Sequence, residues 1–216
     1  MSDQRGLFLA LEGIEGVGKS TQQALLVGWL ESLGISATPA REPGGTRVGE
    51  AIREVVLHRR DLDMPAETEL FLILGSRAAF VRDVVRPTLA AGRALVSDRF
   101  DLSTFAYQGY GRGLPVEEVE QANRLATRGL RPDLYLVLDL PLAEALRRQE
   151  ARGASDRIES AGAEFMMRVH DGYRELARRE SRAELVEGTG SPEEVHERMR
   201  SVLRRRFPET FVPAAG

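Results

Sequence analysis

The chain has 216 residues, 42% of them hydrophobic, and a formal net charge of −3. It contains no cysteine, which excludes disulfide bonds and cysteine-ligated metals, and its near-neutral charge argues against a general nucleic-acid or membrane surface. No signal peptide and no apolar run of membrane length is visible, so we expect a single domain over residues 1–216 in the cytoplasm, without nucleic-acid or membrane partners.

Short apolar runs alternate with stretches of helical spacing along the chain. Because alternating strands and helices build a parallel sheet covered on both faces, we expect a three-layer α/β fold with a parallel five-stranded sheet. The predicted strands are 7–11, 36–41, 93–97, 133–139 and 183–187. The predicted helices are 19–33, 46–58, 66–91, 115–129, 141–151, 161–181 and 191–205. The tail 208–216 is expected to be poorly ordered.

The first strand is followed by Gly13-Ile14-Glu15-Gly16-Val17-Gly18-Lys19-Ser20, which fits the phosphate-binding pattern G-x-x-x-x-G-K-[ST]. Lys19 is the only lysine among 30 lysine and arginine residues, and its flexible ammonium suits the β- and γ-phosphates of a nucleotide. The loop N–H groups and the following helix N-terminus favour phosphate, and the Ser20 hydroxyl suits Mg²⁺. The alternative is an ordinary glycine-rich turn.

Polar residues also follow the second and third strands, as Arg41-Glu42-Pro43-Gly44-Gly45-Thr46 and Asp98-Arg99. Since ligands gather at the carboxyl ends of parallel strands, these residues and the phosphate loop are expected to share one site. An aspartate that ends an apolar strand suits a Mg²⁺ site, and both Asp98 and Asp139 qualify. Either one has the alternative role of a turn or helix-cap residue.

Arg77 falls on the apolar stripe of the helix predicted over 66–91. A charge on an inward face is costly unless it meets an acceptor or anion, so we interpret Arg77 as facing a ligand; a snorkelling or internally paired arginine is the alternative. The segment 101–113, read as a loop or short helix, has the residue types that contact a base or sugar, although a solvent-facing connection is equally compatible with its composition.

Arginines cluster around Gly153-Ala154-Ser155, at positions Arg147, Arg148, Arg152 and Arg157. One interpretation is a mobile lid at about 147–160 that closes over phosphates and supplies a cation to the transferred group. The other is a solvated helix face, on which Glu144 and Arg148 form an i,i+4 pair.

Five motifs in this order resemble the thymidylate kinase family, in its bacterial type with an arginine-rich lid. They are residues 11–21, 41–46, 97–99 with 102–108, 131–134 and 156–159, and the resemblance extends from Leu7 to about Phe207. It implies the nucleoside-monophosphate-kinase variety of the P-loop NTPase fold and a homodimer. It also implies transfer of the γ-phosphoryl group of ATP to dTMP with Mg²⁺, giving dTDP and ADP for dTTP synthesis.

The resemblance further implies roles for single residues. The ATP site would comprise Gly13, Ile14, Glu15, Gly16, Val17, Gly18, Lys19, Ser20, Thr21, Arg147, Gly188 and Thr189. The dTMP site would comprise Glu15, Arg41, Ile73, Arg77, Arg99, Thr104, Tyr107 and Gln108. Ser20 and Asp98 would hold Mg²⁺, and the catalytic cations would be Lys19, Arg99 and Arg152.

Within the dTMP site, Arg41 and Arg99 would clamp the phosphate, Arg77 would face the thymine edge, and Tyr107 would crowd a ribose 2′-hydroxyl. Ile73 stands where the family usually stacks an aromatic ring on thymine.

Gly16 fills the slot where one subtype carries a catalytic arginine, which is why a lid arginine, chiefly Arg152, is expected instead. The competing hypotheses are a kinase for another nucleoside monophosphate or a deoxynucleoside, and a nucleotide-dependent switch without catalytic transfer.

Overall fold

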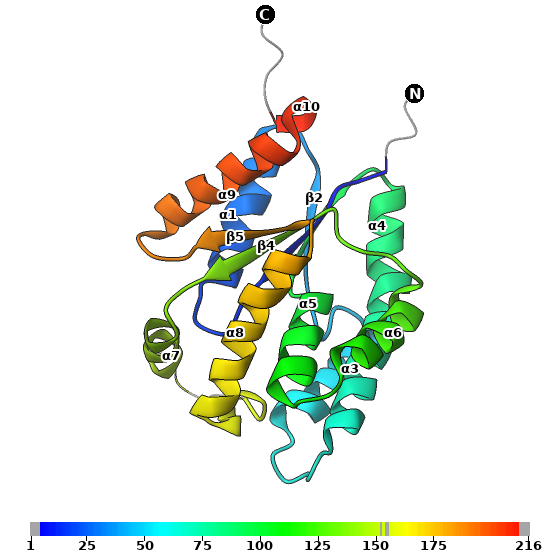
Figure 1. Ribbon diagram of the computed structural model, residues 1–216. Helices are drawn as coiled ribbons and strands as arrows, with labels where there is room; N and C mark the ends of the chain where they lie inside the picture. Colours follow the sequence, from blue (N-terminus) through cyan, green and yellow to red (C-terminus); the bar gives the residue numbers. More distant parts are fainter. Residues whose placement is uncertain (1–4, 152, 154–155, 212–216) are drawn as a thin grey trace, which may run out of the picture.

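The centre of the protein is a five-stranded sheet of order β2-β3-β1-β4-β5, and every neighbouring pair of strands is parallel (Figure 1). The structure is a computed structural model that describes residues 5–151, 153 and 156–211. The strands are β1 (Phe8–Glu12), β2 (Ala37–Arg41), β3 (Ala94–Asp98), β4 (Leu134–Asp139) and β5 (Ala183–Glu187). The predicted parallel sheet is confirmed, since each strand begins and ends within one residue of its expected place.

Helices cover the sheet on both faces, as predicted. They are α1 (Lys19–Ser32), α2 (Arg47–Arg53), α3 (Ala66–Phe80), α4 (Arg86–Ala90), α5 (Asp101–Thr104), α6 (Val116–Thr127), α7 (Leu142–Glu150), α8 (Ala163–Arg179), α9 (Pro192–Arg206) and α10 (Pro208–Phe211). Figure 1 shows α1 and α9 together on one side of the sheet and α8, α5 and α4 on the other. Within the described residues, none of these helices combines the length and apolar character needed to cross a membrane.

Shorter helical stretches join several of these elements. They are the π-helical η1 (Glu54–His58), η2 (Val81–Val85) and η3 (Phe105–Gly111), and the 3₁₀-helical η4 (Glu159–Ala161). Because η2 links α3 directly to α4, the helix predicted over 66–91 is one continuous helical run.

The strand register sets where the site lies. Asp98 at the end of β3 is level with Leu11 of β1 and with Arg41 of β2. The segments that leave these three strands therefore emerge at the same edge of the sheet, as expected for a parallel α/β fold. The phosphate loop, residues 42–46 and Arg99 all begin at this edge.

The segment 101–113 is largely helical and buried, which excludes the alternative of a solvent-facing connection. It forms α5 and η3, and η3 packs closely on α8. A Cβ added at Gly111 would lie 2.6 Å from the Phe165 ring, and one at Gly172 would lie 2.7 Å from Tyr110 Cγ. The two glycines thus permit an approach of η3 and α8 that larger residues would prevent.

The expectation of a poorly ordered tail is wrong for its first part. Residues Pro208–Phe211 form α10, and the Phe211 ring is buried and stacked on Trp29 of α1 at a centroid distance of 5.1 Å. An apolar contact with α1 therefore holds this end of the chain. Residues 212–216 lie outside the described residues.

Candidate functional site

The phosphate loop connects β1 to α1, and its conformation suits an anion. Gly18 lies in the left-handed region (φ 99°) at the N-cap of α1, and no described side chain caps this helix. The first N–H groups of α1 are therefore available to an anion such as phosphate, for which the helix dipole adds favourable charge. Lys19 Nζ folds back over the loop and donates to the carbonyl oxygens of Gly13 (3.2 Å) and Ile14 (2.9 Å).

The surroundings of Lys19 leave its ammonium poorly solvated. Its side chain is buried, and its Nζ lies 3.6 Å from the Glu15 carboxylate. Burial, together with the nearby Arg99 charge, lowers the pKa of Lys19. A phosphate placed in the loop would restore the lost solvation by offering its oxygens to this group.

Gly16 is held close to α7. A Cβ at this position would lie 2.2 Å from the carbonyl oxygen of Ala145, and the φ of Gly16 is 83°. An arginine at residue 16 would therefore require α7 to move, so in this arrangement the loop has no room for a catalytic side chain there.

Asp98, rather than Asp139, lies beside the loop serine. The Ser20 hydroxyl donates to Asp98 Oδ2 at 3.0 Å, whereas Asp139 accepts from Arg174 Nε at 2.9 Å. A hydroxyl next to a carboxylate at the phosphate loop fits Mg²⁺, which prefers oxygen ligands and takes the remainder from phosphates and water. The described residues hold no cluster of three or more acidic, histidine or cysteine side chains suited to a metal on its own.

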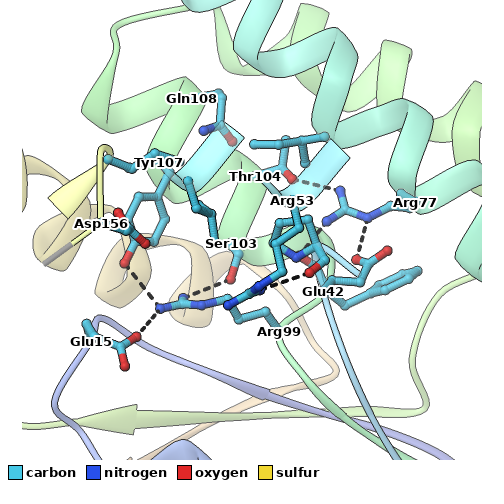
Figure 2. Close-up of a pocket in the computed structure, with 15 residues that line it drawn as sticks. Glu15, Glu42, Arg53, Arg77, Arg99, Ser103, Thr104, Tyr107, Gln108 and Asp156 are labelled. Carbon is cyan, nitrogen blue, oxygen red and sulfur yellow. Dashed lines mark hydrogen bonds and ion pairs between the residues drawn. The ribbon is translucent and has the colours of Figure 1, made fainter. Parts of the chain in front are cut away.

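A cavity of about 170 Å³ lies next to the loop, between α2, α3 and η3 (Figure 2). Its lining includes all but one of the residues predicted for the dTMP site: Glu15, Ile73, Arg77, Arg99, Thr104, Tyr107 and Gln108. Segments that are distant in sequence thus meet at one cavity, and its mixed polar and apolar lining suits a small ligand.

Arg41 is the predicted residue that the structure does not bring to the cavity. It pairs with Glu50 at 3.0 Å, and its side chain is 56% exposed. Arg53 of α2 lines the cavity instead and donates to the Pro43 carbonyl at 2.9 Å. The cause is geometric: Arg41 ends an edge strand with its side chain turned outward, whereas α2 directs Arg53 inward.

Arg53 was not predicted as a site residue, although the sequence carries a signal for it. It precedes the buried Val56 and Leu57 by three and four residues, so it shares their helix face. This is the same pattern of an arginine on an apolar stripe that identified Arg77. Burial and the charges of Arg41 and Arg99 lower the pKa of Arg53. Arg41 thus acts on Arg53 through its charge, although its side chain does not line the cavity.

Arg99 joins the cavity to the phosphate loop. Its guanidinium donates to the Gly13 carbonyl (2.8 Å), the Tyr173 hydroxyl (3.0 Å) and the Glu15 carboxylate (3.0 Å). Its backbone has φ 74°, which is uncommon for a residue other than glycine. The N–H of the next residue, Phe100, donates to the buried carboxylate of Glu12 at 2.8 Å, which helps to hold this turn.

Arg77 is fully buried at the other end of the cavity. It donates to Glu42 (2.8 Å), Thr104 Oγ1 (2.7 Å), Asn123 Oδ1 (3.0 Å) and the Phe100 carbonyl (2.9 Å). Burial raises the pKa of Glu42 to about 7, although the Arg77 charge opposes this effect. Arg77 is thus internally paired and also lines the cavity, so both interpretations drawn from the sequence describe part of its environment.

Ile73 lies on the cavity wall and Phe71 does not. The Ile73 side chain is buried against the cavity, whereas Phe71 is 66% exposed on the outer face of α3. The two residues are two positions apart on one helix, so their side chains lie on different faces of it. Any stacking on a ligand ring at this position is therefore aliphatic.

The predicted lid is divided between two environments. On α7, Arg147 is exposed and Arg148 pairs with Glu144 at 2.5 Å, which is the i,i+4 contact of the solvated-face interpretation. After α7, Asp156 and Ile158 line the cavity. Arg152, the expected catalytic lid residue, lies outside the described residues.

The last two predicted ATP-site residues follow β5 at the same edge of the sheet. The Gly188 N–H donates to the Asp139 carbonyl at 2.7 Å, and the Thr189 hydroxyl donates to the Glu187 carboxylate at 2.6 Å. Thr21 is exposed at the start of α1. None of these three residues lines the cavity, and β5, which Gly188 and Thr189 follow, is the edge strand at the end of the sheet opposite β2.

Comparison with known proteins identifies the family. A family model described as thymidylate kinase matches residues 11–199. The curated thymidylate kinase of Synechococcus sp. (strain JA-2-3B'a(2-13)) is 48% identical over 203 residues, which cover 94% of this chain and 96% of that relative. The one of Kosmotoga olearia is 44% identical over 194 residues, covering 89% of this chain and 93% of that relative.

A solved structure agrees with these relatives. The crystal structure of thymidylate kinase from Ehrlichia chaffeensis matches with a TM-score of 0.75 and 27% identity, covering 92% of this chain and 99% of that one. The expected P-loop fold of the nucleoside-monophosphate-kinase type is thereby confirmed. On the strength of the motifs, the cavity beside the phosphate loop and these matches, the chain belongs to the thymidylate kinase family.

Proposed function

We propose that the protein transfers the γ-phosphoryl group of ATP to the 5′-phosphate of dTMP, giving dTDP and ADP for dTTP synthesis. Family membership makes it a phosphotransferase that acts on a nucleoside monophosphate. The observation that carries the proposal is the placement of one cavity, with Arg53 and Arg99 on its wall, directly against the phosphate loop. The phosphate loop is one anion site. A second anion site beside it, with two arginines on its wall, is expected where two phosphate-bearing substrates meet.

The phosphate loop would bind the donor. The N–H groups at the start of α1 and the Lys19 ammonium would hold the ATP phosphates, and Gly188 and Thr189 would pass the adenine. We assign Mg²⁺ to Ser20 and Asp98, where it would neutralise charge on the β- and γ-phosphates. Lys19 would have to leave its contacts with the Gly13 and Ile14 carbonyls to reach the γ-phosphate.

The cavity would bind the acceptor. Arg53 and Arg99 would hold its phosphate near the loop, and the base would occupy the far end beside Arg77 and Ile73. Tyr107 would lie against the sugar and favour deoxyribose. Arg41 is not part of this proposal, because it pairs with Glu50 and does not line the cavity.

Catalysis would come from positioning and charge. An oxygen of the dTMP phosphate would form a bond to the γ-phosphorus of ATP. The bond between the γ-phosphorus and the β,γ-bridging oxygen would break, and the electron pair of that bond would remain on the bridging oxygen, which becomes a terminal oxygen of ADP. Because the acceptor is already an anion, no strong general base is needed. Lys19 and Arg99 would neutralise the charge that develops between the two nucleotides.

We also propose a lid within this single kinase domain, at about residues 147–160. Arg147 and Arg152 would approach the ATP phosphates when it closes, and closure would exclude water that would otherwise hydrolyse ATP. Gly16 supports a role for lid arginines, since the loop itself has no room for a side chain there.

We further propose that the protein is a cytoplasmic homodimer. Large apolar side chains are exposed on three helices that contact one another through α3: Val48 of α2, Phe71 of α3 and Leu125 of α6. A Phe71→Glu, Leu125→Glu double variant should sediment as a monomer where the wild type sediments as a dimer. A monomeric wild type at micromolar concentration would refute the dimer.

The activity is tested by coupled detection of ADP release with dTMP, dUMP, dCMP, dGMP and AMP as acceptors. We expect the highest kcat/KM with dTMP and little ATP hydrolysis when no acceptor is present. Equal use of all acceptors would overturn the choice of dTMP. Slow hydrolysis that no acceptor accelerates would instead indicate a nucleotide-dependent switch.

A further inference from the structure

Glu69 lies behind the cavity, on α3, and is completely buried. Its carboxylate accepts hydrogen bonds from three side chains. Gln108 Nε2 donates to Oε1 at 2.8 Å, Arg112 donates through Nε (3.1 Å) and Nη2 (2.9 Å), and Arg157 Nη2 donates to Oε2. No role for Glu69 follows from its position in the sequence, but it contacts a residue that lines the acceptor cavity.

The partners of Glu69 keep it ionised. Burial alone would raise the pKa of Glu69, but the hydrogen bonds and charge of Arg112, with the bonds from Gln108 and Arg157, lower it below its ordinary value. An ionised carboxylate accepts hydrogen bonds and donates none. Glu69 therefore dictates which end of the Gln108 amide faces it: the NH₂ group.

The other end of this amide is left for a ligand. Gln108 lines the cavity, and its buried Oε1 has no hydrogen-bond partner within the described part of the chain (Figure 2). A buried acceptor without a partner is costly, and a bound molecule that brings a donor removes this cost. The cavity thus offers a fixed acceptor at Gln108.

We infer that Glu69 is a positioning residue that sets base selectivity, because it holds the Gln108 amide with its oxygen available to the acceptor nucleotide. This inference rests on the proposed function. Thymine and uracil carry a donating N3–H between two carbonyl groups, whereas cytosine has an accepting N3. A fixed acceptor at Gln108 accepts a hydrogen bond from the N3–H of thymine or uracil. The same acceptor repels the lone pair on N3 of cytosine.

Arg157 extends this arrangement to the segment that follows α7. Its backbone N–H donates to the Leu57 carbonyl and its Nε to the Val56 carbonyl, both at 2.8 Å. These contacts anchor Arg157 on η1, so Nη2 reaches Glu69 from a side different from that of Arg112. The guanidiniums of Arg112 and Arg157 thus compensate the negative charge of the buried Glu69 carboxylate. The Gln108 amide, which is uncharged, would not do so on its own.

The test compares kcat/KM for dTMP and dCMP in the full-length protein at saturating ATP. In Glu69→Gln, residue 69 can donate as well as accept, so the Gln108 amide is free to turn over. The ratio of dTMP to dCMP should fall by about tenfold or more, mainly through KM, because a site loses much discrimination when its buried polar groups can re-pair. An unchanged ratio would overturn the inference.

Two further variants separate positioning from general damage. Glu69→Asp keeps an ionised acceptor and should retain more of the ratio than Glu69→Gln; an equal loss in both would indicate a purely structural role and overturn the inference. In a Gln108→Ala background, Glu69→Gln should change the ratio no further. A further fall of similar size there would show that Glu69 acts without Gln108.

Arg157→Gln keeps the inference testable if α3 does not tolerate a change at Glu69. This variant leaves Glu69 in place but removes the guanidinium of Arg157 that binds its carboxylate. The ratio of dTMP to dCMP should therefore fall by a smaller factor than in Glu69→Gln, and an unchanged ratio would overturn the inference. The matched control is Arg205→Gln on α9. It removes a surface ion pair with Glu184 of β5 (2.8 Å) and should leave the ratio of dTMP to dCMP unchanged. If the wild type phosphorylates neither acceptor, the proposed function fails rather than this inference.

Discussion

Glu42 makes the stability of the protein depend on pH in a way that one substitution removes. Its carboxyl is buried beside Arg77, and burial raises its pKa from the ordinary value of 4.5 to about 7. A raised carboxyl pKa means that the folded state binds this proton more tightly than the unfolded state. The resulting stabilisation is complete below pH 4.5 and is lost as the pH rises through about 7.

The size of the effect follows from these two values. The difference between a pKa of 4.5 in the unfolded state and one of about 7 in the folded state corresponds to about 3 kcal/mol over the whole titration. Between pH 5 and 8 most of this titration takes place, so the free energy of unfolding should fall by roughly 2 to 3 kcal/mol on account of Glu42 alone. Burial also raises the pKa of Glu12 and Asp101, and these groups add to the slope in the same direction.

Glu42→Gln isolates the contribution of Glu42, because Glu12 and Asp101 remain in both proteins. Urea unfolding, followed by circular dichroism at several pH values from 5 to 8, gives the free energy of unfolding of each protein. The wild type should lose roughly 2 to 3 kcal/mol more than Glu42→Gln across this range. Parallel curves, or a larger loss in the variant, would refute the reasoning from burial.

Three other predictions use the same structure. Lys19→Ala should abolish phosphoryl transfer without changing the circular dichroism spectrum, and retained turnover would refute the role of the loop. Arg53→Ala should raise KM for dTMP by about 100-fold or more, since hydrogen bonds to charged groups are strong, whereas Arg41→Ala should change it only a few-fold; the reverse order would restore Arg41 as the phosphate clamp. Phe211→Ala should lower the free energy of unfolding by about 3 kcal/mol in a denaturant titration, because it removes the buried ring stacked on Trp29. No measurable loss would show that α10 contributes nothing to stability.

Most of the fold was predictable because buried parallel strands and amphipathic helices leave strong periodic patterns. β1 is a run of apolar residues because both of its faces are covered, and α9 begins at Ser191-Pro192, with Ser191 in a capping box. The helical character of η3 was not predictable from its composition, because it depends on close packing against α8. The helix α10 depends on Trp29, a contact distant in sequence.

The candidate site was predictable where a residue conflicts with its local pattern. Arg77 and the lone Lys19 were singled out in this way, and both are buried at the site. Arg41 was assigned from its motif and from its place at the end of a predicted strand, and neither gives the direction of its side chain. Glu69 was not identified, because its significance depends on Gln108 and Arg157, which only the folded chain brings beside it.

The central claim is that the protein binds two nucleotides at once, with the acceptor in the cavity and the donor on the phosphate loop. Isothermal titration of dTMP into protein already saturated with ADP and Mg²⁺ tests it directly. We predict that one dTMP binds per chain while ADP stays bound, and that Arg53→Ala weakens this dTMP binding. Displacement of ADP by dTMP, or no uptake of dTMP, would contradict the claim.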